Sequence, residues 1–362
     1  MMARILPLLA ASFLLFSPGC DEVLEPAPPD EVEEPEEPAP PEEPEEPQEP
    51  QEPPPPTALA GSTIWSIVAN PTNENIIYAG SYSALFKSMD GGATWLQTSI
   101  QNHVSVIAID PRDDNTLYCG TYTGGNAYIY KTVDSGVTWT QSNGLYGGWY
   151  TDIAIDPRHP DTLFAGAWLA WLGNGLLSRS LNGGASWEIL RQGTPMQYKT
   201  VYALAIDPQD TQTLYAGMRR SVYKSLDHGA TWTDLSLPYA YVTDLLVHPD
   251  RPEIIYAGTY HGVYVSRDGG DSWQAANAGI TDSSLRVSEI VYKAPQKLYL
   301  ATWRGVYVSD SDTIQWSRLV NNVIDENNEV YTLEVTSNGD ILLGTWNGFH
   351  RFAAEIDSVN GP

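Results

Sequence analysis

The chain has 362 residues and a formal net charge of −26, from 45 Asp and Glu against 19 Lys and Arg. Residues 21–57 hold 15 of the acidic residues and no basic one. Apart from Arg4 near the N-terminus, the rest of the chain carries 18 basic and 30 acidic residues, a net charge of −12. This balance argues against a nucleic-acid partner, because binding phosphates needs clustered Lys and Arg. Cys20 and Cys119 are the only cysteines, which excludes a disulfide framework.

Residues 1–19 are predicted to be a lipoprotein-type signal peptide. Arg4 is their only charge, and the mostly apolar run 5–16 is shorter than the roughly 20 residues that a spanning helix needs. Gly19 and Cys20 resemble the bacterial lipobox, with Ser17 where that motif usually has Leu, and the resemblance implies lipidation of Cys20. We expect a protein of the bacterial cell envelope, lipid-anchored on the periplasmic or surface side of a membrane. The alternative is ordinary secretion after cleavage nearby.

Residues 20–57 are predicted to be an acidic, Pro/Glu-rich tether. Fourteen prolines lie among runs such as EEPEEPAPPEEPEEP, with almost nothing apolar to bury. Such a segment cannot offset the entropy lost on ordering, so we expect it to be disordered and extended. At about 3.1 Å per residue it could reach roughly 110 Å.

An eight-residue pattern, Ser/Thr-x-Asp-x-Gly-x-Thr/Ser-Trp, returns through the rest of the chain. Its copies are SMDGGATW (88–95), TVDSGVTW (132–139), SLNGGASW (180–187), SLDHGATW (225–232) and SRDGGDSW (266–273), with a worn copy, SDSDTIQW, at 309–316. They end at Trp95, Trp139, Trp187, Trp232, Trp273 and Trp316. A period in this range, with short strands and turn residues in each unit, indicates the blades of a β-propeller.

Each repeat predicts four short antiparallel strands. In the third repeat, DIAIDP, TLFAG and GLLSRS precede the octad, each bounded by Pro, Gly, Asn or Asp. Seven first strands are expected, at 64–69, 104–109, 151–155, 201–206, 242–247, 288–292 and 330–335. We therefore predict an all-β chain with a single seven-bladed β-propeller over residues 58–356 and a tail at 357–362. The seventh unit has no octad, so TALAG at 57–61 is expected to supply its outer strand and cover the edge.

The octads resemble the Asp-box, or BNR, repeat of sialidases, sortilin-type receptors, two-propeller xyloglucanases and photosystem II assembly factors. In those families the boxes lie on the face away from the active site. The residue types also suit a turn, because Asp accepts backbone N–H bonds, Gly permits positive φ and Trp packs as an anchor. A structural role is expected for Asp90, Asp134, Asn182, Asp227 and Asp268, and for the six tryptophans.

The opposite face is predicted to be the binding face. The residue two places after the glycine of the repeated YAG strand is aromatic in six of seven units: Tyr82, Tyr122, Trp168, Arg219, Tyr260, Trp303 and Trp346. Loops between blades add Trp149, Tyr150, Tyr198, Tyr239 and Tyr241. An exposed aromatic surface suits sugar rings or apolar protein anchors. The alternative is that a repeated position simply covers the top of each blade.

Asp152, Asp244 and Glu289 are the candidate catalytic residues, because they lie near the starts of first strands, at the channel mouth. Flanking carboxylates are what a glycoside hydrolase requires, so hydrolysis of extracellular glycans is the alternative function. Carboxylates at a channel rim are more commonly solvated or bound to ordinary cations. Sialidases need an arginine triad and carry an Arg-Ile-Pro motif; that motif is absent here, and Arg219, beside Arg220, is the only arginine at a repeated position of the opposite face. Xyloglucanases place a catalytic Asp after the second strand, where this chain has Tyr or Trp.

We therefore expect a non-catalytic propeller that binds a protein or polysaccharide through its aromatic face and acts as an assembly platform. The resemblance to photosystem II assembly factors fits the size and the single ring. Those proteins are expected to use a basic surface patch, for which only Arg219 and Arg220 are candidates here. No cofactor and no metal site are expected. We also expect membrane contact only through the lipid anchor, and a monomer.

Overall fold

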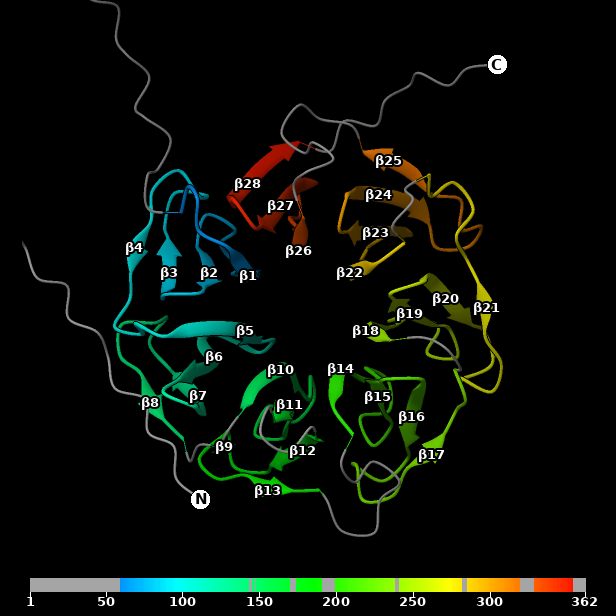
Figure 1. Ribbon diagram of the computed structural model, residues 1–362, viewed down its shortest axis with the longest axis horizontal. Coiled ribbons are helices and arrows are strands. Elements are labelled where there is room, and N and C mark those ends of the chain that lie inside the picture. The colour runs from blue at the N-terminus through cyan, green and yellow to red at the C-terminus, as the bar shows by residue number, and fades with distance from the viewer. Residues whose placement is uncertain are drawn as a thin grey trace, which may run out of the picture. The chain divides into compact units, whose positions relative to one another are not determined.

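The computed structural model describes residues 59–142, 145–146, 148–169, 174–190, 199–237, 241–281, 285–319 and 329–353. These residues form 28 strands and no helix, arranged as seven antiparallel sheets around one axis (Figure 1). The predicted all-β, seven-bladed propeller is confirmed. The predicted signal peptide, tether and C-terminal tail, together with Cys20, lie outside the described residues.

Each sheet begins at the axis, with its strands following in chain order. The seven inner strands are β1 (Ile64–Ala69), β5 (His103–Asp110), β10 (Gly148–Ile155), β14 (Val201–Ile206), β18 (Val242–Val247), β22 (Val287–Lys293) and β26 (Val330–Val335). The second strands are β2 (Ile77–Ser81), β6 (Asp113–Thr123), β11 (Leu163–Leu169), β15 (Leu214–Met218), β19 (Ile255–Thr259), β23 (Lys297–Thr302) and β27 (Asp340–Thr345).

The third strands are β3 (Leu85–Ser88), β7 (Asn126–Thr132), β12 (Asn174–Ser180), β16 (Ser221–Ser225), β20 (Gly262–Ser266), β24 (Gly305–Asp310) and β28 (Gly348–Ala353). Six sheets end in a short fourth strand after the octad: β4 (Leu96–Gln97), β8 (Thr140–Gln141), β13 (Glu188–Ile189), β17 (Thr233–Asp234), β21 (Gln274–Ala275) and β25 (Ser317–Leu319). In the second sheet β9 (Leu145–Tyr146) also pairs with β7. The seventh sheet has three strands among the described residues.

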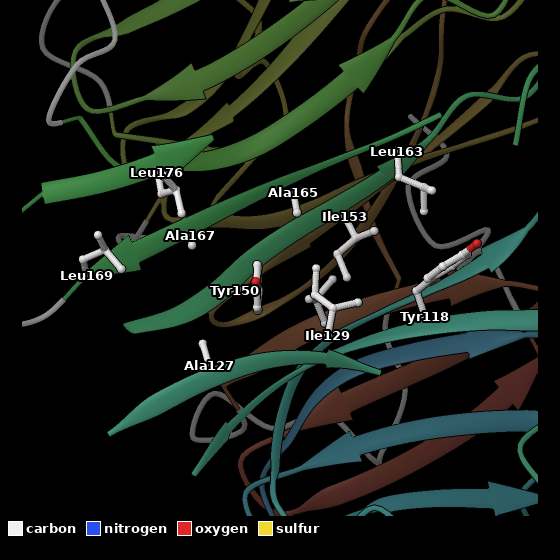
Figure 2. Close-up of a cluster of buried hydrophobic side chains, with 11 residues drawn as sticks. Tyr118, Ala127, Ile129, Tyr150, Ile153, Leu163, Ala165, Ala167, Leu169 and Leu176 are labelled. Carbon is white, nitrogen blue, oxygen red and sulfur yellow. The ribbon is translucent and has the colours of Figure 1, made fainter. Parts of the chain in front are cut away.

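Neighbouring blades pack through apolar side chains, because the sheets bury both faces between one blade and the next. Figure 2 shows such a cluster, in which Tyr118 and Ile129 of the second blade meet Tyr150 and Ile153 of β10. Comparable clusters join the other blades, and Leu342 of the seventh blade belongs to a cluster of the first. Burial of apolar surface at these joints is the main stabilising contribution to the ring.

The glycine of the YAG strand allows the blades to approach closely. A Cβ on Gly258 would lie 2.6 Å from Cγ1 of Val287, which belongs to the inner strand of the next blade, and a Cβ on Gly217 would lie 2.5 Å from Cγ1 of Val242. These positions therefore need glycine for space, as expected where another backbone approaches a strand. In the sixth blade Ala301 occupies the same place, opposite Glu289.

Each Asp box forms the turn between a third and a fourth strand. Asp90 Oδ1 accepts hydrogen bonds from Thr94 N and Ser88 Oγ, both at 2.8 Å, and Trp95 Nε1 donates to Gly92 O at 3.0 Å. The bond from the box Thr or Ser N–H recurs at Asp134, Asn182, Asp227 and Asp268.

Hydrogen bonds within the box also tune the carboxylates. They lower the pKa of Asp134 and of Asp268 to about 2, with the hydroxyls of Thr132 and Ser272 the largest causes respectively. The worn octad has Ser311 in place of the carboxylate, and its Trp316 instead donates from Nε1 to Ala276 O at 2.8 Å.

In five blades, a basic side chain on the third strand donates to the Asp box of the next blade. Lys87 donates to Ser135 O and Lys131 to Gly183 O, at 2.7 and 2.9 Å. Arg179 and Lys224 make the equivalent bonds in the third and fourth blades. Arg351 of β28 donates to Gly91 O at 3.0 Å, so the same contact joins the last blade to the first and closes the ring.

The segment expected to complete the seventh blade adopts another structure where it is described. Leu59, Ala60 and Gly61 form a turn rather than a strand. Gly61 has a φ of 75° and donates from its N–H to Asn347 O, in the turn between β27 and β28, while the Leu59 side chain is buried. These contacts fix the residues at the end of β28 and not along its edge. Thr57 and Ala58 lie outside the described residues.

Candidate functional site

Every inner strand carries a β-bulge at the same place. Its pairing with the second strand skips one residue, between Ile64 and Ser66 in the first blade and between Val242 and Asp244 in the fifth. A bulge leaves that residue unpaired and redirects its side chain. The seven unpaired residues are Trp65, Ser105, Thr151, Tyr202, Thr243, Ser288 and Tyr331.

All seven bulge residues line one pocket of about 280 Å³, which we call the mouth pocket. Its remaining wall consists of Trp149, Tyr150, Tyr260, Arg286, Val287 and Trp303, so that seven of 13 lining residues are aromatic. The volume is close to the lower limit of small-molecule pockets, about 300 Å³. Such a pocket suits one small group of a ligand.

The mouth pocket and the Asp boxes lie at opposite ends of the blades. In the first sheet Ile77 pairs with Ser88, where the Asp box begins. The bulge residue Trp65 is next to Ser66, which pairs with Gly80 near the other end of β2. The Asp boxes therefore mark the face away from the pocket.

The predicted binding-face residues form a rim at the pocket end of the blades. Tyr260 and Trp303 line the mouth pocket, whereas Tyr82, Tyr122, Trp168, Arg219 and Trp346 do not. Trp168 lies directly behind the pocket, since its ring centroid is 4.5 Å from that of Trp149, its cross-strand partner. Tyr82 is the most exposed aromatic residue of the set, at 74%.

Stacked side chains organise one side of the rim. Tyr241 and Tyr260 stack with centroids 4.9 Å apart and an angle of 16° between the rings. The guanidinium carbon of Arg286 lies 4.0 Å from the Tyr260 centroid and 3.5 Å from that of Trp303. Arg219 makes a similar contact, 4.9 Å from the Tyr241 centroid.

The three candidate catalytic acids lie one residue after the bulges and face the next blade. Asp152 and Asp244 accept hydrogen bonds from Leu204 N and Ile290 N, both at 2.6 Å. Glu289 accepts one from Leu333 N at 2.7 Å. Ser66 and Thr332 have the same role in other blades, with hydroxyl oxygens as acceptors. These side chains join neighbouring inner strands, and none of the three acids lines the mouth pocket.

The surroundings of these acids raise their pKa values. Burial raises the pKa of Asp152 to about 7, and the nearby charge of Asp244 adds to the rise. Burial likewise raises the pKa of Asp244 and of Glu289, and the Asp244 charge raises that of Glu289 further. A neutral carboxyl can still accept the backbone hydrogen bond, so protonation is compatible with the joint between blades.

Sequence reasoning missed the bulge residues Trp65, Tyr202 and Tyr331, and also Arg286. The sequence signal that could have identified the bulge residues is their position in the repeat. Each directly precedes Ser66, Asp152, Ala203 or the equivalent residue of its unit. Trp149, Tyr150 and Tyr241, expected in blade-to-blade loops, lie at the pocket or beside it. Tyr198 and Tyr239 lie outside the described residues.

The described residues contain no cluster of His, Cys, Asp or Glu that could hold a metal ion. Cys119 is buried in β6, where burial raises the pKa of its thiol. None of the residues that the structure describes forms a helix able to span a membrane.

The chain is similar in fold to several known propeller proteins. A family model described as Sortilin, neurotensin receptor 3 (Sortilin-Vps10), matches residues 175–304. No curated protein matches the chain by sequence. The GH74 xyloglucanase from Xanthomonas campestris is similar in structure, with a TM-score of 0.67 and 15% identity over 84% of this chain and 54% of that enzyme.

Two further structures are not described as glycoside hydrolases. YCF48 from Cyanidioschyzon merolae has a TM-score of 0.59 and 12% identity, over 81% of this chain and 96% of its own. The extracellular domain of a protein described as a one-component system from B. thetaiotaomicron has a TM-score of 0.62 and 17% identity, over 82% and 39%. The chain spans about half the length of the GH74 enzymes it matches. Likeness at these identities shows the fold alone.

Proposed function

We propose that the protein is a non-catalytic binding propeller of the bacterial cell envelope, which holds a protein or polysaccharide ligand at the mouth pocket and serves as an assembly platform. The observation that carries this proposal is the convergence of seven bulge residues, one from each blade, in a single pocket with aromatic walls. Concave sites with flat apolar walls and a few polar groups are where ligands bind. Lipidation of Cys20 and an extended tether would hold the propeller away from a membrane.

The structural relatives support a binding function. A YCF48 structure contains a D1 peptide, and the GH74 relatives include a xyloglucanase, so propellers of this shape receive both peptides and glycans. The acids that a hydrolase would need are engaged in this chain by Leu204, Ile290 and Leu333. The pocket wall instead presents rings and hydroxyl groups.

Substitution of Tyr260 and Trp303 together by Ala should abolish binding without unfolding the ring. We would titrate the full chain against xyloglucan, polygalacturonate and a peptide array, and compare variants by thermal unfolding. Loss of two central aromatic anchors should weaken the best ligand at least tenfold. Tyr82→Ala, on the rim but outside the pocket, is the matched control and should bind normally. Equal binding by the double variant would contradict the proposal.

A glycoside hydrolase remains the second candidate because of Asp152. Burial raises the pKa of Asp152 to about 7, in the range of a general acid at neutral pH, but its carboxyl accepts from Leu204 N and does not line the mouth pocket. Incubation with the same polysaccharides distinguishes the two functions. Release of oligosaccharides that stops in Asp152→Asn would establish hydrolysis, whereas binding without release supports the platform.

A further inference from the structure

Arg286 presents a cation in the mouth pocket whose N–H groups have no acceptor within the described part of the chain. Its guanidinium packs against the rings of Tyr260 and Trp303, and it is half-buried. Contacts with rings leave the N–H groups, which lie in the guanidinium plane, free to donate. A partly buried guanidinium that lacks an acceptor in the protein favours a negatively charged ligand, because that ligand would replace the lost hydration.

Other partly buried arginines of the propeller are used differently. Arg179 pairs with Glu188 and donates to His228 O, and Arg351 pairs with Asp340 and donates to Gly91 O. Both therefore complete joints between or within blades. The Arg286 side chain makes no such hydrogen bond or ion pair with the residues that the structure describes, although its backbone oxygen accepts from Trp303 N at 3.1 Å.

We propose that the mouth pocket binds a uronic acid residue of an acidic polysaccharide, with Arg286 receiving the carboxylate and the aromatic walls receiving the sugar ring. This inference rests on the proposed binding function and names its ligand. A planar guanidinium fork fits a carboxylate in a two-bond arrangement, and the stacked rings hold the fork in place. A pocket of about 280 Å³ suits a group the size of one sugar ring rather than a long side-chain array.

Hydroxyl groups in the same wall suit the remaining polar atoms of a sugar. Thr243 Oγ1 has no hydrogen-bond partner among the described residues. The equivalent hydroxyls of Thr151 and Ser288 are occupied, since they donate to Val201 O and Val330 O, both at 2.5 Å. The Thr243 hydroxyl is therefore left without a partner, although it is shielded from solvent within the wall that also contains Arg286.

The pocket is less suited to a peptide strand. Peptides that add to a sheet need a row of unpaired backbone groups at its edge. Around the axis, the edge N–H groups of Ile67, Ile107, Leu204, Ile290 and Leu333 are already bonded to side chains of the preceding blade. A sugar needs no such edge.

Acidic neighbours do not cancel the Arg286 charge. Glu329 is the carboxylate whose charge acts on Arg286, but no ion pair joins the two among the described residues, and its Oε2 accepts from Tyr331 Oη at 2.7 Å. Asp244 and Glu289 accept hydrogen bonds from backbone N–H groups of the next blade, and neither lines the mouth pocket. Among the described residues, no carboxylate is therefore bonded to the Arg286 side chain.

The test is calorimetric titration of the full chain with trigalacturonate and with its carboxyl-reduced, neutral counterpart. We expect the acid to bind about 10- to 100-fold more tightly, as for a charge-assisted pair of hydrogen bonds. Arg286→Gln should remove this preference, and Arg286→Lys should restore part of it. Glu329→Gln should tighten binding of the acid but not of the neutral sugar, a change that a merely structural Arg286 would not produce.

Arg219→Gln is the matched control, because Arg219 also packs on a tyrosine but lies outside the pocket. It should leave the acid preference unchanged, and thermal unfolding should show that the Arg286 variants remain folded. If the acid and the neutral sugar bind equally, and the Tyr260/Trp303 double variant binds neither, the acid preference is wrong but the proposed binding function still holds. Binding of peptides alone would overturn the sugar assignment, and binding of neither class would overturn the proposed function as well.

Discussion

Two consecutive residues have separate tasks in five of the seven inner strands. Thr243 is unpaired at its bulge and lines the mouth pocket, whereas Asp244 accepts a hydrogen bond from Ile290 N and joins two blades. The pocket wall can therefore vary from blade to blade, from Ser105 to Trp65, while the following residue keeps the ring together. A titratable residue near the axis is therefore not a catalytic candidate on the ground of its position alone.

Asp152→Asn should make the protein more stable at pH 8 but not at pH 4. The folded pKa of about 7 lies above the ordinary value of 3.8, so between these values the folded chain retains a proton that the unfolded chain has released. The free energy of unfolding must then fall as pH rises through this window. Asn keeps an oxygen acceptor for Leu204 N and cannot ionise, so the gain at pH 8 should be up to about 4 kcal/mol.

Urea unfolding of both proteins at pH 4, 6 and 8 measures this difference. The Asp-box carboxylates do not interfere, because their lowered pKa values, about 2 for Asp134 and Asp268, affect stability only at lower pH. A difference that does not change with pH would show that Asp152 is already ionised in the folded chain.

The elements themselves were largely predictable, and the bulges were not. Apolar runs such as 242–247 and the octads indicate strands and turns by composition, and β18 (Val242–Val247) has the predicted bounds. A strand pattern assumes that side chains alternate, so a single extra residue changes which side chains face the axis. Trp65 and Tyr202 therefore look like ordinary strand residues in the sequence. Only the pairing of Ser66 and Ala203 with the second strands reveals them.

Gly258→Ala should destabilise the fold by about 1–3 kcal/mol, the usual range for overpacking. The added methyl group would lie 2.6 Å from Cγ1 of Val287, a rigid β-branched side chain on the next blade. Chemical unfolding should show the loss. Adding Val287→Ala should recover part of it, with a coupling energy between the two sites. Ala301→Gly, at the same place in the sixth blade, is the control and should cost only about 1 kcal/mol or less. Full tolerance of Gly258→Ala would show that the blades can move apart.

At the scale of the whole molecule, the ring joins its two ends by side chains. Arg351 donates to Gly91 O, and Ser337 Oγ donates to Glu74 Oε2 at 2.9 Å, so the seventh blade is fixed to the first without a fourth strand among the described residues. The mouth pocket exists only in the closed ring, because every blade contributes at least one wall residue. The residues that line the pocket could not be predicted from any single repeat. Arg286, for example, packs against Tyr260 of the fifth blade and Trp303 of the sixth.

The crystal structure of the full chain with trigalacturonate tests the central claim most directly. If titration shows no preference for the acid, the crystals are grown with the tightest-binding neutral oligosaccharide in place of trigalacturonate. We expect a sugar ring in the mouth pocket against Trp303 and, for the acid, its carboxylate on Arg286. A ligand seated at the Asp-box face, with the mouth pocket empty, would contradict it.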